Sequence, residues 1–176
     1  HLPYVSWDLT ESVITHNIDG RTQLRPWNDP RDPWDSILFV MRTMIEPLVA
    51  QYPDVRFAHL NYVDGRDSDA IPVAIAIAQI FGGEAYVAGP DLEHEQHELY
   101  FRAPGTPVAA RVEWADGRGT HRFFDRGLIV VTDGTNEATI ETGERTLRNH
   151  LTGELVCGGT VAIPAAPTIQ GWFCVD

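Results

Sequence analysis

Along the first hundred residues, hydrophobic positions alternate between the spacing of strands and that of helices. From Ile37 to Leu48 they recur every three or four residues, which predicts a helix with one buried face. Asp32 and Pro33 supply a start signal for this helix, as N-cap and first helical residue. Pro47 is expected to kink its last turn.

Three short apolar runs predict strands, at residues 4–7, 55–63 and 84–88. The proline-rich stretch between the first run and the helix is typical of a long surface loop. The nearly all-apolar segment 70–81 predicts a second helix, capped by Asp69 and buried against a sheet. A strand, a helix and a strand at this spacing form a βαβ unit with parallel strands and a right-handed crossover.

After Pro104 the pattern changes to short alternating strands separated by turns. Asp116-Gly117 is a strong hairpin signal between the first two of them. The expected strands cover residues 109–114, 120–124, 128–132, 138–141, 146–151, 155–157, 160–163 and 172–175. Such spacing predicts an antiparallel β-sandwich. The expected fold is therefore α/β in residues 1–105, with βαβ units and a partial parallel sheet, which the resemblance described below implies to be barrel-like, followed by an antiparallel β-sandwich in residues 106–176.

The net negative charge of the chain argues against nucleic acid as a partner. Its 13 basic residues are all arginine and face 25 acidic residues, for a net charge of −12. Such a surface repels nucleic acid, and no apolar run is long enough to span a membrane. The lack of lysine has two interpretations: genomic base composition or a salty habitat, or an acidic cleft for cations or neutral polar substrates. Since the chain starts at His1 rather than at a methionine, we expect it to be processed, trimmed or a fragment.

Polar side chains gather after each predicted strand of the parallel sheet. Ligand sites of such sheets lie at the carboxyl ends of the strands, so the loops there define a candidate site on one edge. Its candidate ligand-binding residues are Asp8 after the first strand, Asn61, Tyr62, Asp64, Arg66, Asp67 and Asp69 after the second, and Asp91 and His94 after the third. Three tryptophans could stack on sugar rings, or pack in the core and loops instead: Trp7, Trp27 and Trp34.

The acidic residues of this candidate site have two interpretations. Asp64, Asp67 and Asp69 could provide a carboxylate pair for acid–base chemistry or hold a calcium ion; as turn formers and helix caps they would be purely structural. Their spacing does not match an EF-hand loop, and His94 and His97 are three residues apart rather than the four of the zinc-protease helix motif. We therefore expect no cofactor other than a calcium ion, assign no metal site, and name no catalytic residue.

Cys157 and Cys174 are the only cysteines. If the last two strands pair, the two thiols could form a disulfide that closes a loop of about 17 residues. An even number of cysteines favours an exported protein, and two buried free thiols are the alternative. We predict the disulfide, and an extracellular or exported protein rather than a cytoplasmic one.

Three stretches of the chain carry a family resemblance. They are the alanine-rich helix that runs into Gly82-Gly83-Glu84-Ala85-Tyr86, the strand Phe124-Asp125-Arg126-Gly127-Leu128-Ile129-Val130-Val131-Thr132, and the segments 151–154 and 159–164. The first is similar to the last helix and strand of a barrel, and the others to the opening strand and closing hairpin of an appended β-sandwich. Over residues 55–176 the chain thus resembles the C-terminal region of glycoside-hydrolase-like (β/α)8-barrel proteins.

The resemblance implies a carbohydrate-active, glycoside-hydrolase-like protein, whose partner is a carbohydrate polymer or oligosaccharide. A full barrel needs about 250 residues, so the catalytic carboxylate pair is expected upstream, or lost in a reduced descendant. The alternative is an exported, non-catalytic module that binds a polymer or assembles with other subunits. In either case we expect an upstream segment or another chain to cover the small parallel sheet, so that the protein does not stand alone as a monomer.

Overall fold

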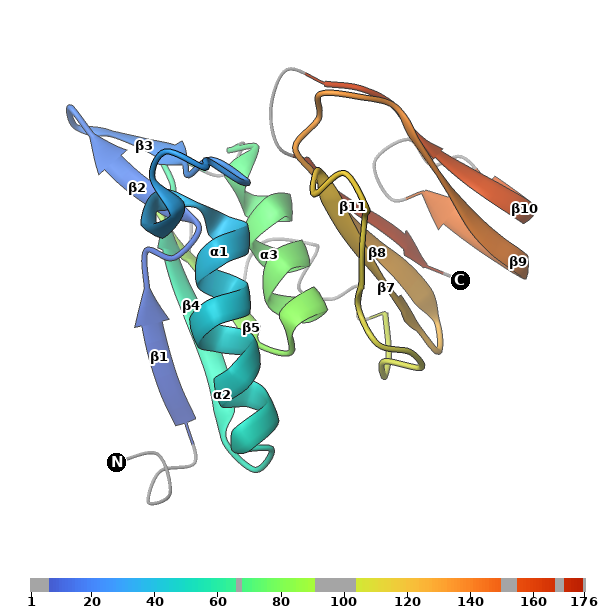
Figure 1. The fold of residues 1–176 in the computed structure, drawn as a ribbon, viewed down its shortest axis with the longest axis horizontal. Helices are drawn as coiled ribbons and strands as arrows, with labels where there is room; N and C mark the ends of the chain where they lie inside the picture. Colours follow the sequence, from blue (N-terminus) through green and yellow to red (C-terminus); the bar gives the residue numbers. More distant parts are fainter. Residues whose placement is uncertain (1–6, 66–67, 91–103, 150–154, 167–169, 176) are drawn as a thin grey trace.

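The computed structural model describes residues 7–65, 68–90, 104–149, 155–166 and 170–175. They form a three-stranded parallel sheet, a separate β-hairpin and a six-stranded antiparallel sheet (Figure 1). The helices lie on the side of the parallel sheet that faces the antiparallel one. The chain is therefore a mixed α/β protein with a large share of β-structure.

The parallel sheet consists of β1 (Trp7–Glu11), β4 (Arg56–Tyr62) and β5 (Glu84–Ala88), in the order β1-β4-β5. The expected parallel pairing is confirmed. Because the sheet has three strands, β1 and β5 each leave one edge unpaired within the described residues. The first strand was expected to end at Trp7, but β1 continues to Glu11. Asp8 therefore lies inside this strand and not in a loop after it, which corrects its predicted placement.

The stretch expected to be a long loop contains a hairpin, formed by β2 (Thr15–Ile18) and β3 (Arg21–Leu24). Its turn residues, Asp19 and Gly20, have φ values of 52° and 77°. Two successive positive φ angles are typical of the tight type I′ turn, whose twist matches that of the flanking strands. The loop prediction is therefore wrong for residues 15–24.

The first long helix is continuous but contains one wide turn. Its three parts are α1 (Ile37–Val40), a π-helical turn (Met41–Ile45) and α2 (Glu46–Gln51). The N–H of Glu46 donates to the carbonyl of Met41, five residues earlier. The wide turn directly precedes Pro47, which has no N–H for the regular ladder. The expected irregularity at this proline thus takes the form of a π-bulge.

The start of this helix differs from the prediction. Asp32 precedes only a short 3₁₀ turn, Pro33–Asp35, and makes no side-chain capping hydrogen bond. Ser36 is the residue before α1, and its hydroxyl accepts a hydrogen bond of 2.6 Å from the N–H of Asp29. The side chain that ties the loop to the helix start is therefore Ser36.

The second long helix, α3 (Ala70–Phe81), has the predicted bounds. It ends at Gly82, whose φ of 91° is the left-handed conformation typical of helix ends. Its start does not follow the prediction, because Asp69 makes no capping hydrogen bond. The N–H of Ala70 instead donates to the hydroxyl of Ser68 at 3.3 Å.

The antiparallel sheet has the strand order β10-β9-β11-β8-β7-β6. Its strands are β6 (Val112–Glu113), β7 (Gly119–Phe124), β8 (Gly127–Thr132), β9 (Ala138–Asn149), β10 (Leu155–Ile163) and β11 (Gln170–Val175). The hairpin predicted at Asp116-Gly117 is confirmed by the pairing of β6 with β7. Two expected strand pairs, 138–141 with 146–151 and 155–157 with 160–163, are each one longer strand. A register shift in β10 falls at the glycines between the two parts expected there.

Strand β8 is shared between two hydrophobic cores. Ile129 and Val131 belong to the core that contains the buried residues of α3, whereas Leu128 and Val130 belong to a second core with residues of β9 and β10. Alternate side chains of a strand point to opposite faces, so the sheet has α3 on one side and its own outer strands folded over the other (Figure 1). The predicted boundary at residue 105 therefore does not separate two independent cores, because residues of the α/β half and of the β half pack in the same one.

Polar contacts also join the two halves. The indole N–H of Trp27 donates to the carbonyl of Gly117 at 3.0 Å, and the guanidinium of Arg111 pairs with Glu46 at 2.9 Å. Trp27 is 3% exposed, so the structure supports its core-packing role rather than stacking on a sugar ring.

The two cysteines lie on strands that do not pair with each other. Cys157 is in β10 and Cys174 in β11, and β9 runs between them. The direct pairing of the last two strands, which was the condition for neighbouring cysteines, is therefore not met. Strands two positions apart are separated by about 9–10 Å, while a disulfide needs Cα atoms within about 7 Å. This spacing weighs against a disulfide between Cys157 and Cys174. The positions of their side chains are outside the described part of the structure, so the disulfide stays a prediction.

Candidate functional site

The two faces of the parallel sheet differ in what covers them. On β4, Phe57, His59 and Asn61 are buried, and their neighbours on β5 belong to the core of α3. The alternate residues of β4, Ala58, Leu60 and Tyr62, lie on the opposite face. We call this the open face, because no described helix or strand covers it (Figure 1).

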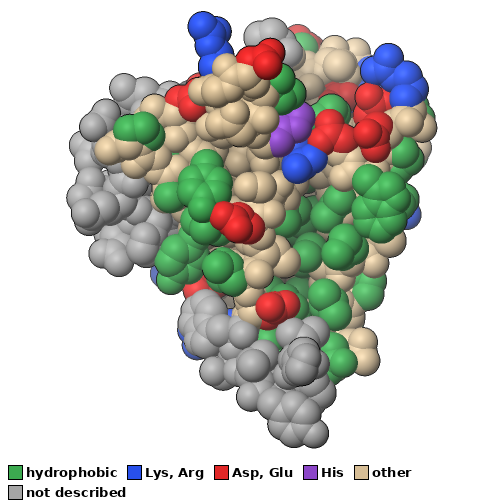
Figure 2. All heavy atoms as spheres, turned by 90° about the vertical axis from the view of Figure 1, so that its left-hand side faces the viewer, with side chains coloured by type: hydrophobic (Ala, Val, Ile, Leu, Met, Phe, Trp, Pro, Cys, Tyr) green, Lys and Arg blue, Asp and Glu red, His purple; other side chains and the backbone are tan. Residues whose placement is uncertain are grey.

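The open face is formed by Leu9 and Glu11 of β1, Ala58, Leu60 and Tyr62 of β4, and Tyr86 of β5. Leu9 is 59% exposed and Tyr62 45% exposed. Figure 2 shows hydrophobic side chains gathered over this side of the molecule, with acidic side chains among them. Parallel sheets are usually covered on both faces, so an exposed leucine and tyrosine on one face mark a surface that a further element or ligand would bury.

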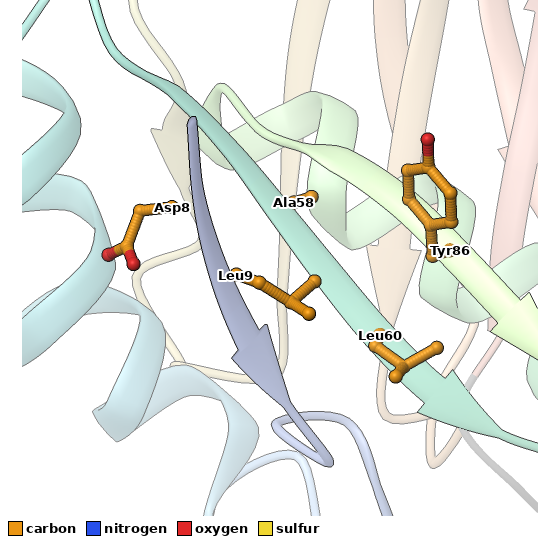
Figure 3. A pocket seen from close by; sticks show the side chains of 5 residues that line it. All are labelled: Asp8, Leu9, Ala58, Leu60 and Tyr86. Carbon is orange, nitrogen blue, oxygen red and sulfur yellow. The ribbon is translucent and has the colours of Figure 1, made fainter. Parts of the chain in front are cut away.

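A depression of about 310 Å³ lies in the middle of the open face. Leu9, Ala58, Leu60 and Tyr86 line it, and Asp8 lies at its border (Figure 3). The side chain of Asp8 points away from the other four. The walls of the depression are therefore almost entirely apolar.

Polar groups meet at the carboxyl end of this face. The hydroxyl of Tyr62 donates a hydrogen bond of 2.6 Å to Oε1 of Glu11. The hydrogen bond and the charge of this carboxylate raise the pKa of Tyr62. Glu11 and Tyr62 are the last residues of their strands, so the pair lies where sites of α/β sheets form.

A second hollow, of about 380 Å³, runs along the unpaired edge of β1 and the exposed side of α1 and the π-turn. We call it the edge groove. Its apolar side includes Trp34 and Met44, which are 61% and 45% exposed. On its polar side, Arg25 pairs with Asp35 and donates through Nε to the carbonyl of Ser12 at 3.0 Å. The groove thus has the outer edge of β1 on one side and an exposed helix surface on the other.

Asn61, a predicted ligand-binding residue, has a structural role. Its side chain is fully buried, and Oδ1 accepts from the N–H groups of Ile14 at 3.0 Å and Thr15 at 3.4 Å. Its amide nitrogen donates to the carbonyl of His59 at 3.2 Å. Asn61 therefore holds the chain between β1 and β2 against β4, and its polar atoms do not face a ligand.

We expect the Asn61→Ala variant to lose about 2–4 kcal/mol of unfolding free energy, because two backbone N–H groups would lose a buried acceptor. Urea denaturation followed by circular dichroism measures the loss. Asp64→Ala is the matched control: its exposed carboxylate accepts from the N–H of Thr22 at 3.1 Å, so its removal should cost less than about 1 kcal/mol. Equal stability of the two variants would contradict the structural role of Asn61.

The remaining predicted site residues divide into three sets: two at the end of β4, one at the start of α3, and four outside the described residues. Tyr62 and Asp64 lie at the carboxyl end of β4, as expected, with Asp64 bound to the hairpin backbone. Asp69 is exposed at the start of α3. Arg66, Asp67, Asp91 and His94 lie outside the described residues, as does His97. Glu11, which the sequence did not single out, joins Tyr62 at this edge.

Among the described residues, no group of three or more histidine, cysteine, aspartate or glutamate side chains has the geometry of a metal site. The calcium ion considered from the sequence stays a prediction. Nor does any helix in the described ranges have the length and hydrophobicity needed to cross a membrane.

Comparison with known proteins gives no identification: no family model, no curated protein and no solved structure matches this chain.

Proposed function

We propose that this chain is the C-terminal part of a carbohydrate-active, glycoside-hydrolase-like (β/α)8-barrel protein. The observation that carries the proposal is the parallel sheet β1-β4-β5. Among the described residues, helices cover one face of this sheet and none covers the other, and the outer edge of β1 has no neighbouring strand. In a barrel of this type the helices form the outer ring and the opposite face of each strand lines the interior. The open face corresponds to that interior.

The edge groove supports the same proposal. In a barrel, the strand that precedes β1 would pair with the free edge of β1, and the helix that precedes α1 would pack beside α1. The groove supplies an apolar surface for such a helix, through Trp34 and Met44. One preceding β/α unit would therefore satisfy the edge of β1 and cover the exposed helix surface together.

The antiparallel half supports the appended β-sandwich that the resemblance implies. Leu128 and Val130 of β8 share a core with Ile140 and Leu147 of β9, so two layers of one sheet pack on each other. The other face of β8 packs on α3, which would lie on the outside of the barrel. We propose this arrangement as a sandwich docked on the last helices of the barrel.

The test compares one substitution in two contexts, the isolated 176-residue chain and the native protein at whatever length its intact mass shows. Leu9→Glu should change the stability of the isolated chain by less than about 1 kcal/mol, because Leu9 is already exposed. In the native protein the same glutamate would enter a barrel interior and should cost about 3–5 kcal/mol. We also expect the isolated chain to associate in sedimentation experiments, and Leu9→Glu to reduce that association.

Leu155→Glu is the matched control, since Leu155 is 50% exposed on β10, away from the open face. It should have little effect in either context. A native protein with the mass of 176 residues that sediments as a stable monomer and unfolds cooperatively would contradict the proposal. It would favour the non-catalytic binding module instead.

A further inference from the structure

The pair formed by Glu11 and Tyr62 has a position that a ligand could reach. Glu11 is in register with Leu60, and both lie on the open face. Tyr62 is two residues further along β4, on the same face, and its hydroxyl meets Oε1 of Glu11 at 2.6 Å. The carboxylate thus stands at the carboxyl end of the sheet. Glu11 itself lines the edge groove, and its register partner Leu60 lines the apolar depression.

The Glu11–Tyr62 pair differs from the other polar residues at this edge in its hydrogen-bond partners. Asn61 and Asp64 each bind backbone N–H groups and so fix the hairpin. In the part of the chain that the structure describes, Glu11 and Tyr62 bind each other and no backbone group. Because both are exposed, their contact contributes little to stability. The fold therefore does not account for an oriented carboxylate at this place.

The surroundings of the pair combine the two kinds of surface that bind a sugar ring. The depression offers the side chains of Leu60 and Tyr86, which can contact the apolar C–H face of the ring (Figure 3). The carboxylate accepts hydrogen bonds, and those made by an ionised acceptor are the stronger kind. A mostly apolar pocket with a few oriented polar groups is typical of small-molecule sites.

We infer that Glu11 contacts a bound saccharide, accepting hydrogen bonds from its hydroxyl groups at the carboxyl end of the open face, and that Tyr62 is a positioning residue for this carboxylate. The inference rests on the proposed function, because closure of the barrel would turn the open face into a walled cavity. Within that barrel, Glu11 is the side chain of this chain that would touch the saccharide, and Tyr62 would orient it.

The test uses the native protein at its intact length, titrated calorimetrically with maltohexaose, cellohexaose, xylohexaose and chitohexaose. For whichever of these binds, Glu11→Gln should weaken the affinity by about tenfold or more, because a charge-assisted hydrogen bond becomes a neutral one. Tyr62→Phe should weaken it several-fold. Glu84→Gln is the matched control: Glu84 lies at the amino end of the same sheet, paired with Arg56 at 3.6 Å, and its change should leave binding intact.

A double-mutant cycle separates positioning from a general structural effect. Since Tyr62 acts through Glu11, Tyr62→Phe should cause no further loss of affinity when Glu11→Gln is already present. The thermal midpoints of both single variants should stay within about 2 °C of the parent, as expected for an exposed pair.

Two outcomes would overturn the inference: unchanged affinity in Glu11→Gln, or no binding of any of the four oligosaccharides by the native protein. Neither outcome affects the Leu9→Glu comparison, which tests burial of the open face without any sugar. A large cost of Leu9→Glu together with an unaffected Glu11→Gln would reject the saccharide contact and keep the barrel. A negligible cost of Leu9→Glu in the native protein would reject the barrel itself.

Discussion

Replacing Ala76 by aspartate is expected to lower the unfolding free energy by about 3–5 kcal/mol, much of what holds a domain of this size together. Ala76 has no exposed surface, and α3 lies between the parallel sheet and strands β8 and β11 (Figure 1). A carboxyl group there would either remain charged in an apolar core or take up a proton without a designed partner. Urea denaturation followed by circular dichroism measures the loss.

Ala50→Asp is the matched control for this change. Ala50 is an exposed residue of α2, so the same substitution on another helix should cost less than about 1 kcal/mol. Because the core of α3 also contains Ile129 and Val131 of β8, the Ala76→Asp variant should lose structure in both halves at once. Similar unfolding curves for the two variants would contradict the central position of α3.

Helix α3 and strand β5 could be predicted residue by residue, and the reason is physical. A nearly all-apolar segment of this length is buried around most of its circumference, with Pro72 and Gln79 half-buried, and Gly82 supplies the left-handed residue that ends the helix. A buried helix is the structure that such a sequence pattern predicts most clearly. The turn at Asp116-Gly117 was equally clear, because its residue types favour the positive φ angles of a tight hairpin.

The hairpin β2–β3 was missed although its turn carries the same signal, Asp19-Gly20. Its strands, Thr15–Ile18 and Arg21–Leu24, are mostly polar and give no strong alternation of apolar residues. They are held instead by long-range contacts, such as that from the N–H of Thr22 to Asp64. A local pattern does not record an acceptor that lies 42 residues away.

The candidate site could be predicted only in part because residue type does not tell which face of a strand a side chain occupies. Asn61 and Tyr62 are neighbours in the sequence, yet the first is buried toward the helices and the second is exposed on the open face. Glu11 was overlooked because the first strand was expected to end before it. Once β1 extends to Glu11, its parity with Leu9 places it on the open face, beside Tyr62.

The protein is expected to lose about 3 kcal/mol of stability between pH 7 and pH 4 through one buried side chain, His59. Its ring is fully buried, Nδ1 lies 2.5 Å from the hydroxyl oxygen of Thr10, and Nε2 has no hydrogen-bond partner among the described residues. The close approach of Gly83 leaves no space at Nε2, since a Cβ there would lie 2.4 Å from it. Burial lowers the pKa of His59 from 6.5 to about 4.

The direction of the effect follows from which state binds the proton. Above pH 6.5 His59 is neutral in both the folded and the unfolded chain, so its contribution is fully present. As the pH falls below 6.5, the unfolded chain takes up a proton that the folded chain does not, and stability is lost until the folded pKa of about 4 is reached. His59→Asn cannot titrate and should remove most of this pH dependence, whatever its own stability at pH 7. His16→Asn, at a partly exposed histidine of β2, should leave the dependence in place. Urea denaturation of the three proteins at pH 7.0, 5.5 and 4.5 measures it, and equal slopes for His59→Asn and the parent would show that His59 does not carry the effect.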